Sequence, residues 1–215
     1  MSELLRIERL RVHRGSRTVI DVEAMSVPSD VVTVVSGPAG SGKTTLVQAL
    51  CGALDSDGSV AIDGKPLRGT PSQRRRLGLS AVVRDGERIL GCTVDEALRI
   101  ATRRTGRHAA AVDKLPQLRS RLGVAAHLLS GGEQRLLQFA CAWVADPRVL
   151  VLDTPTVGLA GDAVHTVTTL ALEQAAGGSA VLWLEADARA APKPAAYRLV
   201  RGRLEAAEAS DPAPA

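Results

Sequence analysis

A glycine-rich segment enclosed by two apolar stretches constrains the fold of this chain more than any other feature. It follows the β-branched run Val31 to Val35 and overlaps a helical spacing of apolar residues from Thr44 to Leu54. In that setting the glycines let successive backbone N–H groups turn toward one anion, to which the following helix presents its N-terminus. The segment predicts a phosphate-binding loop formed by Gly37, Pro38, Ala39, Gly40, Ser41, Gly42, Lys43, Thr44 and Thr45.

Two side chains of this loop indicate the ligand. In loops of this type the lysine reaches the β- and γ-phosphates of a nucleotide, and the hydroxyl of the next residue ligates Mg²⁺. Lys43 and Thr44 hold these two positions. We therefore expect ATP and Mg²⁺ as cofactors.

The rest of the chain alternates between strand-like and helix-like stretches, which predicts an α/β core with a mostly parallel sheet. The helix-like stretches after the loop are Asp95 to Arg104 and Glu133 to Val144, and the further strand-like runs are Ala81 to Val83, Val149 to Leu152 and Ala180 to Leu184. Before the loop, Leu5 to Val12 and Val19 to Val27 are typical of antiparallel strands, as is Ser59 to Ile62 between two turn signals. We expect one domain over 1–205, with a small N-terminal β subdomain, a helical subdomain inserted at about 86–130, and a disordered tail at 206–215.

Composition narrows the class of protein. The 215 residues are 45% hydrophobic, yet the longest apolar runs fall far short of the about 20 residues that a membrane-spanning helix needs. Together with the lack of a signal-like apolar block, this predicts a cytoplasmic protein, whose cysteines Cys51, Cys92 and Cys141 stay reduced. The net charge of +4 is spread along the chain and only 2% of residues are aromatic, so nucleic-acid binding is not expected. We interpret the run Arg74 to Arg76 as a solvated face within a connection.

A second glycine motif lies far along the chain from the first. Ser130, Gly131, Gly132 and Glu133 open the predicted helix Glu133 to Val144, which makes another helix N-terminus suited to an anion. Two phosphate cradles in one chain are redundant unless each serves a different nucleotide.

This combination resembles the ABC ATPase family, whose signature is such a Ser-Gly-Gly segment followed by a strand that ends in Asp. The resemblance implies a P-loop NTPase fold of the ABC type. It also implies a head-to-tail pair of ABC domains, identical or different, in which the signature of one covers the γ-phosphate bound by the other. Asp153 is similar to the family's carboxylate that holds Mg²⁺ through water. The segments 129–134, 146–153 and 158–160 are most similar to importers of branched-chain amino acids, which implies transmembrane permease partners and a peripheral position on the inner face of the cell membrane.

Two positions depart from the family pattern in ways that bear on hydrolysis. Thr154 stands where the family places a Glu that activates the attacking water, and a hydroxyl cannot accept that proton at neutral pH. Ala186 stands at the switch position, where a His or Gln usually reads the γ-phosphate. We expect hydrolysis at this loop to be weak or dependent on a partner. Glu185, next to the switch, is an alternative base.

Two more positions are less fixed by the resemblance. The loop that usually offers Gln to Mg²⁺ holds Arg84 or Asp85, of which Asp85 is a candidate metal ligand and Arg84 would repel the metal. The aromatic platform for adenine falls near His13, whose imidazole can stack.

These observations favour the ATP-binding subunit of an ABC membrane transporter, an importer by resemblance. The main alternative is a stand-alone or regulatory nucleotide-binding ABC protein without a membrane partner. A DNA-maintenance ABC ATPase would carry inserted coiled coils or zinc-binding cysteines, which are lacking, and a P-loop small-molecule kinase would leave the second glycine motif unexplained.

Overall fold

The core of the protein is a set of parallel strands that are buried on both faces. In the computed structural model, which describes residues 2–84, 86, 88–102, 106–193 and 195–207, these strands are β3 (Val32–Ser36), β8 (Ala180–Glu185), β7 (Val149–Asp153) and β6 (Leu79–Val82). They pair in parallel in that order. Every residue of β3, β7 and β8 is buried, which explains why their sequences are almost continuously apolar. The predicted parallel core is confirmed.

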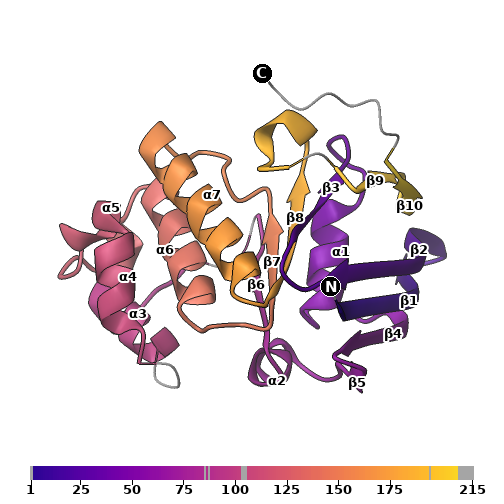
Figure 1. Cartoon of the computed structure of the whole chain (residues 1–215), viewed down its shortest axis with the longest axis horizontal. Helices are drawn as coiled ribbons and strands as arrows, with labels where there is room; N and C mark the ends of the chain where they lie inside the picture. Colours follow the sequence, from indigo (N-terminus) through magenta and orange to yellow (C-terminus); the bar gives the residue numbers. More distant parts are fainter. Residues whose placement is uncertain (1, 85, 87, 103–105, 194, 208–215) are drawn as a thin grey trace.

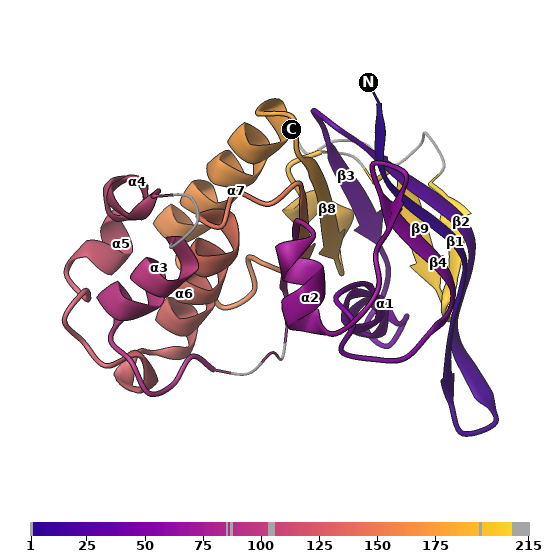
Figure 2. The same cartoon turned by 90° about the horizontal axis from the view of Figure 1, so that it is seen from below.

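Helices cover both faces of this core (Figures 1 and 2). Helix α1 (Lys43–Leu50) packs on one face together with the side chains of Val35, Val151 and Leu184. Helices α6 (Gly131–Trp143) and α7 (Gly161–Ala176) cover the other face, against Val34 and Trp183. Because side chains alternate along a strand, neighbouring residues of β3 serve the two different layers.

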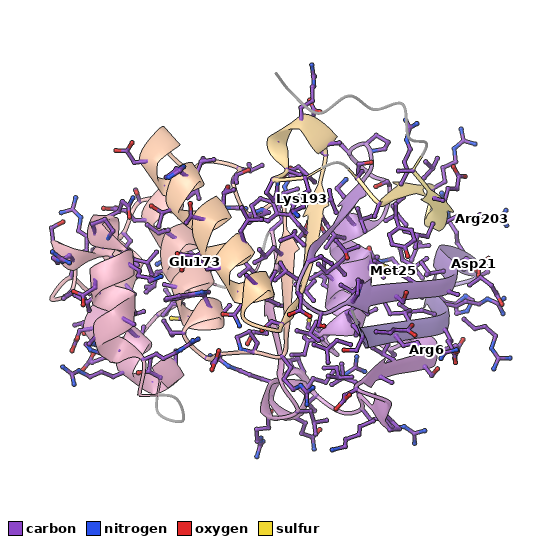
Figure 3. The ribbon with its side chains drawn as sticks, in the orientation of Figure 1. Arg6, Asp21, Met25, Glu173, Lys193 and Arg203 are labelled. Atoms are coloured by element: carbon purple, nitrogen blue, oxygen red, sulfur yellow. The ribbon has the colours of Figure 1, made fainter. Side chains whose placement is uncertain are left out.

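The strands outside the core extend the same sheet, which has the order β5-β4-β1-β2-β10-β9-β3-β8-β7-β6 in the described part of the chain. The long strands β1 (Glu3–Arg14) and β2 (Arg17–Pro28) form the predicted antiparallel hairpin, and β4 (Asp57–Ile62) and β5 (Lys65–Pro66) continue it outward. The sequence pattern does not predict β9 (Tyr197–Val200) and β10 (Arg203–Ala206). They join the hairpin to the core, because β9 pairs with β3 and β10 pairs with β2. Asp21 and Arg203 mark this junction in Figure 3.

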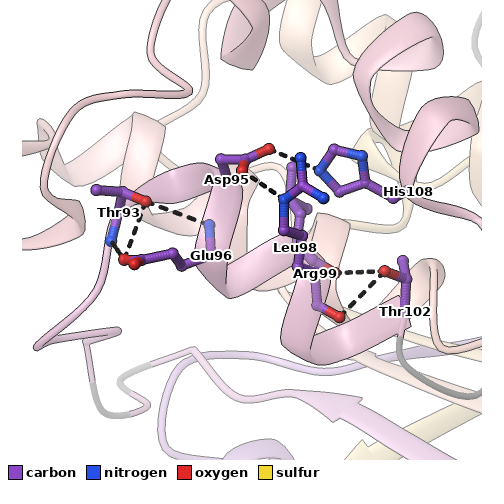
Figure 4. A network of polar contacts seen from close by, with 7 residues as sticks. All are labelled: Thr93, Asp95, Glu96, Leu98, Arg99, Thr102 and His108. Atoms are coloured by element: carbon purple, nitrogen blue, oxygen red, sulfur yellow. Dashed lines mark hydrogen bonds and ion pairs between the residues drawn. The ribbon is translucent and has the colours of Figure 1, made fainter.

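The predicted helical insertion contains α3 (Val94–Thr102), α4 (His108–Lys114), α5 (Pro116–Arg119) and the 3₁₀ turn η1 (Ala126–Leu128). Polar contacts fix the start of α3: the carboxylate of Glu96 accepts the backbone N–H of Thr93 at 2.7 Å, and Asp95 contacts both Arg99 and His108 (Figure 4). A single bridge between Thr93 and Ala125 ties the two ends of this insertion together.

The arginine run at 74–76 is helical. Arg75 and Arg76 are exposed, in agreement with a solvated face, whereas Arg74 is partly buried and takes part in packing. Helix α2 (Pro71–Arg76) begins with a capping box between Thr70 and Gln73. The guanidinium of Arg74 donates to the carbonyls of Ala49 and Leu50 at 2.8 Å, at the end of α1. The guanidinium thus adds a charged donor at the helix end, where the Ala49 carbonyl also accepts the backbone N–H of Gly52 at 3.1 Å.

The predicted disordered tail covers 206–215, of which Ala206 lies in strand β10 and 208–215 lie outside the described residues. The 3₁₀ turn η2 (Ala188–Ala190) follows β8. Among the described residues, no helix has both the length and the apolar character to span a bilayer.

Candidate functional site

The phosphate-binding loop joins the end of β3 to the start of α1, as its sequence predicts. The backbone N–H of Gly37 donates to the carbonyl of Glu185 on β8 at 3.1 Å, so the start of the loop is anchored to the neighbouring strand. A Cβ at Gly37 would lie 2.4 Å from the carbonyl oxygen of Leu199, which explains the glycine there. Gly42, the N-cap of α1, has φ of 108°, a left-handed conformation that glycine adopts without strain. Pro38, Ala39 and Gly40 are exposed at the crest, Ser41 is buried below it, and Thr45 is half-buried in α1.

The ammonium group of Lys43 lies inside the loop. It donates to the carbonyls of Gly37 and Pro38, at 2.5 and 2.9 Å, and to the hydroxyl of Ser41 at 3.3 Å. Its side chain is only 6% exposed, and burial lowers its pKa. These acceptors hold a cation where an arriving phosphate would find it, because oxygens of a phosphate can replace the loop carbonyls.

Thr44 and Asp153, two of the three expected metal-binding residues, are brought together across 109 positions of sequence. The hydroxyl of Thr44 donates to Oδ2 of Asp153 at 2.7 Å. Asp153 ends β7 with no exposed surface, and its Oδ1 has no hydrogen-bond partner among the described residues. A buried carboxylate oxygen without a partner is costly unless a ligand satisfies it. A hydroxyl beside an unsatisfied carboxylate oxygen fits Mg²⁺ held partly through water.

No described group of three or more His, Cys, Asp or Glu side chains could hold a metal ion by itself. Mg²⁺ usually takes only one or two ligands from the protein. Asp85, the third expected ligand, lies outside the described residues, so its role stays a prediction.

Thr154, at the position of the family's general base, is completely buried directly after Asp153. Its φ of 47° is uncommon for a β-branched residue. Its N–H donates to the carbonyl of Leu184 at 2.8 Å, and its own carbonyl accepts from Arg135 at 3.0 Å. The hydroxyl Oγ1, however, has no partner among the described residues. The side chain therefore sits at the edge of the site without a group that could take a proton from water.

The end of β8 carries the switch position and the alternative base. Ala186 offers only its backbone N–H, which donates to Oε1 of Glu185 at 3.0 Å. The other carboxylate oxygen of Glu185 accepts from the indole of Trp183 at 3.4 Å. Glu185 is 2% exposed, and burial raises the pKa of its carboxyl group. Its two oxygens are thus engaged by the strand end itself.

Arg135 is a site residue that the sequence reading missed. From the first turns of α6 it donates to the carbonyl of Thr154 at 3.0 Å and to the carbonyl of Arg84 at 2.8 Å. The N–H of Arg84 in turn donates to Asp153 at 3.2 Å. One guanidinium therefore connects α6 with two backbone segments, at Arg84 and Thr154, that border Asp153. Its place directly after the signature motif was the only signal in the sequence.

The second glycine motif forms the start of α6, and its side chains cap their own helix. Ser130 and Glu133 make a reciprocal capping box, at 3.3 and 2.9 Å. Arg121 also binds Glu133, at 2.6 Å, and mainly this contact lowers the pKa of the Glu133 carboxyl group to about 2. Gly131 and Gly132 follow Ser130 at the helix start, and a Cβ at Gly132 would lie 2.8 Å from the carbonyl oxygen of Gly158. Because α6 and α1 cover opposite faces of the sheet (Figure 2), the two glycine motifs belong to separate layers.

His13 lies on the outer face of the β1–β2 hairpin. Its Nδ1 is 3.2 Å from the hydroxyl of Thr18, and its Nε2 is 3.3 Å from the carboxylate of Asp57 on β4. Both contacts direct the imidazole away from the hairpin face that carries Val12 and packs with α1. The expected stacking of adenine on His13 stays a prediction that this geometry does not favour.

Together, the fold and the loop define a P-loop NTPase of the ABC type. Among solved structures, the ATP-binding subunit of an ABC transporter superposes with a TM-score of 0.82 at 24% identity, covering 94% of this chain and 88% of that one. A nucleotide-free ATP-binding cassette from an ABC transporter gives a TM-score of 0.79, also at 24% identity, over 95% and 90%.

Sequence comparison identifies the family. The ABC transporter family model matches residues 21–157. The high-affinity branched-chain amino acid transport ATP-binding protein BraG of Pseudomonas aeruginosa is 31% identical over 212 residues, covering 94% of this chain and 91% of that protein. The Fe(3+) ions import ATP-binding protein FbpC of Streptomyces coelicolor is 36% identical over 162 residues, covering 71% and 45%. The Nod factor export ATP-binding protein I of Ralstonia nicotianae is 32% identical, covering 83% and 58%. This chain therefore belongs to the ABC transporter family of ATP-binding proteins.

Proposed function

We propose that this protein is the ATP-binding subunit of an ABC importer and that its own P-loop binds ATP with Mg²⁺ but hydrolyses it slowly. One observation carries the proposal: Thr154 occupies the base position beside an otherwise well-formed site. Lys43, Thr44 and Asp153 are assembled as a nucleotide and its metal would require. The buried hydroxyl that follows Asp153 cannot take up the proton of the attacking water.

The neighbouring groups do not replace the missing base. Ala186 has no polar side-chain atom, and both oxygens of Glu185 accept hydrogen bonds from its own strand end. A positioned general base is worth roughly 10²–10⁴ in rate, so its loss alone reduces turnover to a small fraction of that of a complete site. Bound ATP would then act mainly by holding a closed dimer together.

The proposed partner is a second ABC domain that carries a glutamate at the equivalent position. This chain would lend its intact signature, Ser130 to Glu133, to the partner's P-loop, where turnover takes place. The importer assignment rests on the similarity to branched-chain amino acid and Fe(3+) import proteins, and it implies permease subunits and a position on the inner face of the membrane.

The test measures phosphate release by the purified chain and its variants at Thr154. We expect the unmodified chain to turn over slowly and Thr154→Glu to be at least about 10-fold faster, because it restores a carboxylate at the base position. Thr154→Gln is the matched control, since it adds the same bulk without a base. Thermal melting of each variant checks that the buried substitution leaves the protein folded.

Rapid turnover by the unmodified chain, abolished by Lys43→Ala, would contradict the impaired site. Equal rates for the Glu and Gln variants would show that a base at residue 154 does not limit hydrolysis. Co-purification from the native host identifies the partner domain and the permease, and a chain that pairs only with itself would contradict the asymmetric pair.

A further inference from the structure

Arg84 lies at the edge of the sheet where the phosphates of a nucleotide would bind, and the site described above gives its side chain no role. It follows the end of β6 by two residues. Strands β6 and β7 are parallel, with Val82 opposite Leu152, so the residues after β6 come next to Asp153. The carboxyl ends of parallel strands form the edge at which α/β proteins bind their ligands.

The backbone of Arg84 is fixed beside the carboxylate of Asp153. Its N–H donates to Oδ2 of Asp153 at 3.2 Å, and its carbonyl accepts from Arg135 at 2.8 Å. The hydroxyl of Thr44 donates to the same Oδ2, at 2.7 Å. One carboxylate oxygen therefore lies between the backbone of Arg84 and the first turn of α1, which places Arg84 next to the phosphate-binding loop.

The guanidinium of Arg84 is not used by these contacts. Both of them involve backbone groups, and within the described part of the chain the guanidinium makes no hydrogen bond or ion pair. Arg84 is exposed, whereas Asp153 has no exposed surface. A cation at the rim of a buried carboxylate is accessible to an anion that enters the site.

The charge of Arg84 also acts on the lysine of the loop. Burial has the largest effect on the pKa of Lys43 and lowers it, and the positive charge of Arg84 lowers it further. Two positive charges that repel each other are stabilised when an anion binds between them. A guanidinium suits that anion, because its planar fork of donors matches the oxygens of a phosphate.

The described charges at this edge are balanced without a metal ion. The two carboxylates are those of Asp153 and Glu185, and burial raises the pKa of Glu185, which favours its neutral form. Lys43 and Arg84 are the cations. In most sites of this type Mg²⁺ neutralises the phosphate charge, and an arginine can supply part of the same neutralisation.

We propose that the guanidinium of Arg84 binds the terminal phosphate of the nucleotide and lets this site retain ATP without Mg²⁺. The inference rests on the proposed function, because it requires a nucleotide on the loop. Lys43 binds the phosphate chain from inside the loop, and Arg84 binds its end from the side of Asp153. The same charge that would repel the metal thus replaces part of its effect on the ligand. A site that holds ATP and hydrolyses it slowly has no need of the metal for binding.

The experiment measures the binding of ATP and ADP to the full chain by isothermal titration calorimetry in the presence of EDTA. We expect the wild type to bind ATP under these conditions. Arg84→Gln should weaken that binding by about 10- to 100-fold, the range for the loss of one hydrogen bond to a charged group. ADP, which lacks the terminal phosphate, should bind equally well to both. Arg84→Lys keeps the charge and should restore most of the affinity for ATP.

The same titrations with Mg²⁺ separate the effect of charge from a distortion of the site. Because the metal then neutralises part of the phosphate charge, Arg84→Gln should weaken Mg-ATP binding clearly less than it weakens metal-free ATP binding. A substitution that only distorted the loop would weaken both equally, and ADP binding as well. Arg76→Gln is the matched control: this arginine is also exposed, it lies at the end of α2, and its loss should change neither affinity.

Two results would overturn the proposal and leave the proposed function intact. The first is a wild type that binds Mg-ATP but no ATP in EDTA. The second is an Arg84→Gln variant whose affinity for metal-free ATP equals that of the wild type, or falls by the same factor with and without Mg²⁺. A wild type that binds ATP under neither condition would contradict the proposed nucleotide-binding function itself, and this inference would fail with it.

Discussion

Replacing Thr154 with valine should stabilise the protein, because the substitution removes a buried hydroxyl that has no hydrogen-bond partner among the described residues. The residue has no exposed surface, so bulk water does not reach the hydroxyl. Valine keeps the β-branched shape of threonine and creates no cavity. The unusual φ of 47° penalises both residues alike, so backbone strain cancels in the comparison.

The magnitude follows from the cost of a buried, unsatisfied polar group, about 1–3 kcal/mol. For a chain of 150–250 residues, each kcal/mol shifts the melting temperature by about 2–4 °C. We therefore expect Thr154→Val to raise the melting temperature by a few degrees, and by up to about 12 °C at the upper end of this range.

Thr102→Val is the matched control for this prediction. The hydroxyl of Thr102 is also buried, but it donates to the carbonyls of Leu98 and Arg99, at 2.8 and 3.2 Å (Figure 4). Its removal should lower stability by about 0.5–1.5 kcal/mol. Both variants are compared with the wild type by calorimetric and urea unfolding without nucleotide. If Thr154→Val destabilises the protein as Thr102→Val does, the hydroxyl has a partner and the reasoning is refuted.

Two further substitutions test the packing at the C-terminal end of α1 and the pH dependence of stability at Glu185. Arg74→Ala should destabilise the protein by about 1–3 kcal/mol in urea unfolding, because it leaves the last carbonyls of α1 without a charged donor. Arg76→Ala is the control. It removes a contact with the Ser72 carbonyl and should destabilise the protein less. Burial raises the pKa of Glu185 in the folded state, so its contribution to stability is present below the unfolded pKa and is lost as pH rises through the folded value. Glu185→Gln should therefore raise the melting temperature more at pH 8 than at pH 4, and an equal effect at both would contradict the shift.

The elements around the loop could be predicted because local patterns determine them. A β-branched run, a glycine segment and an apolar helix face follow one another in sequence, and the structure places β3, the loop and α1 in that order. Helix α2 could also have been found, since Thr70 and Gln73 have the spacing of a capping box around Pro71.

Strands β9 and β10 could not be predicted in the same way. They are four residues each, and they carry arginines at Arg198 and Arg203. Their pairing partners, β3 and β2, lie more than 150 residues away in sequence. Such short strands form by pairing with two strands of the sheet that are distant in sequence. Because this pairing depends on tertiary contacts, the local sequence pattern does not predict it.

The residues of the candidate site are likewise predictable from the sequence only in part. Thr44 and Asp153 could be predicted as metal-binding residues from their motifs, and they do meet. The hydrogen bond from Arg135 to the Thr154 carbonyl could not be predicted from the sequence, because it depends on how α6 packs against the end of β7. The face on which His13 lies depends on a bulge at Val19 and on the pleat of β1, neither of which the sequence specifies.

The charges of Asp153 and Glu185 at the buried strand ends explain why a threonine at residue 154 suits a site that is proposed to hold ATP. Asp153 and Glu185 end neighbouring strands, and both are almost fully buried. Burial lowers the pKa of Lys43, and the two carboxylates oppose this effect by favouring its charged form. A third carboxylate at residue 154 would add negative charge beside Asp153 and Glu185 at low local dielectric, which would disfavour a polyanionic ligand on the loop. Under the proposed function, Thr154→Glu should thus gain turnover and lose affinity for ATP, while Thr154→Gln loses neither charge balance nor binding. A glutamate variant that binds ATP as tightly as the glutamine variant would show that the missing charge contributes nothing to retention of the nucleotide.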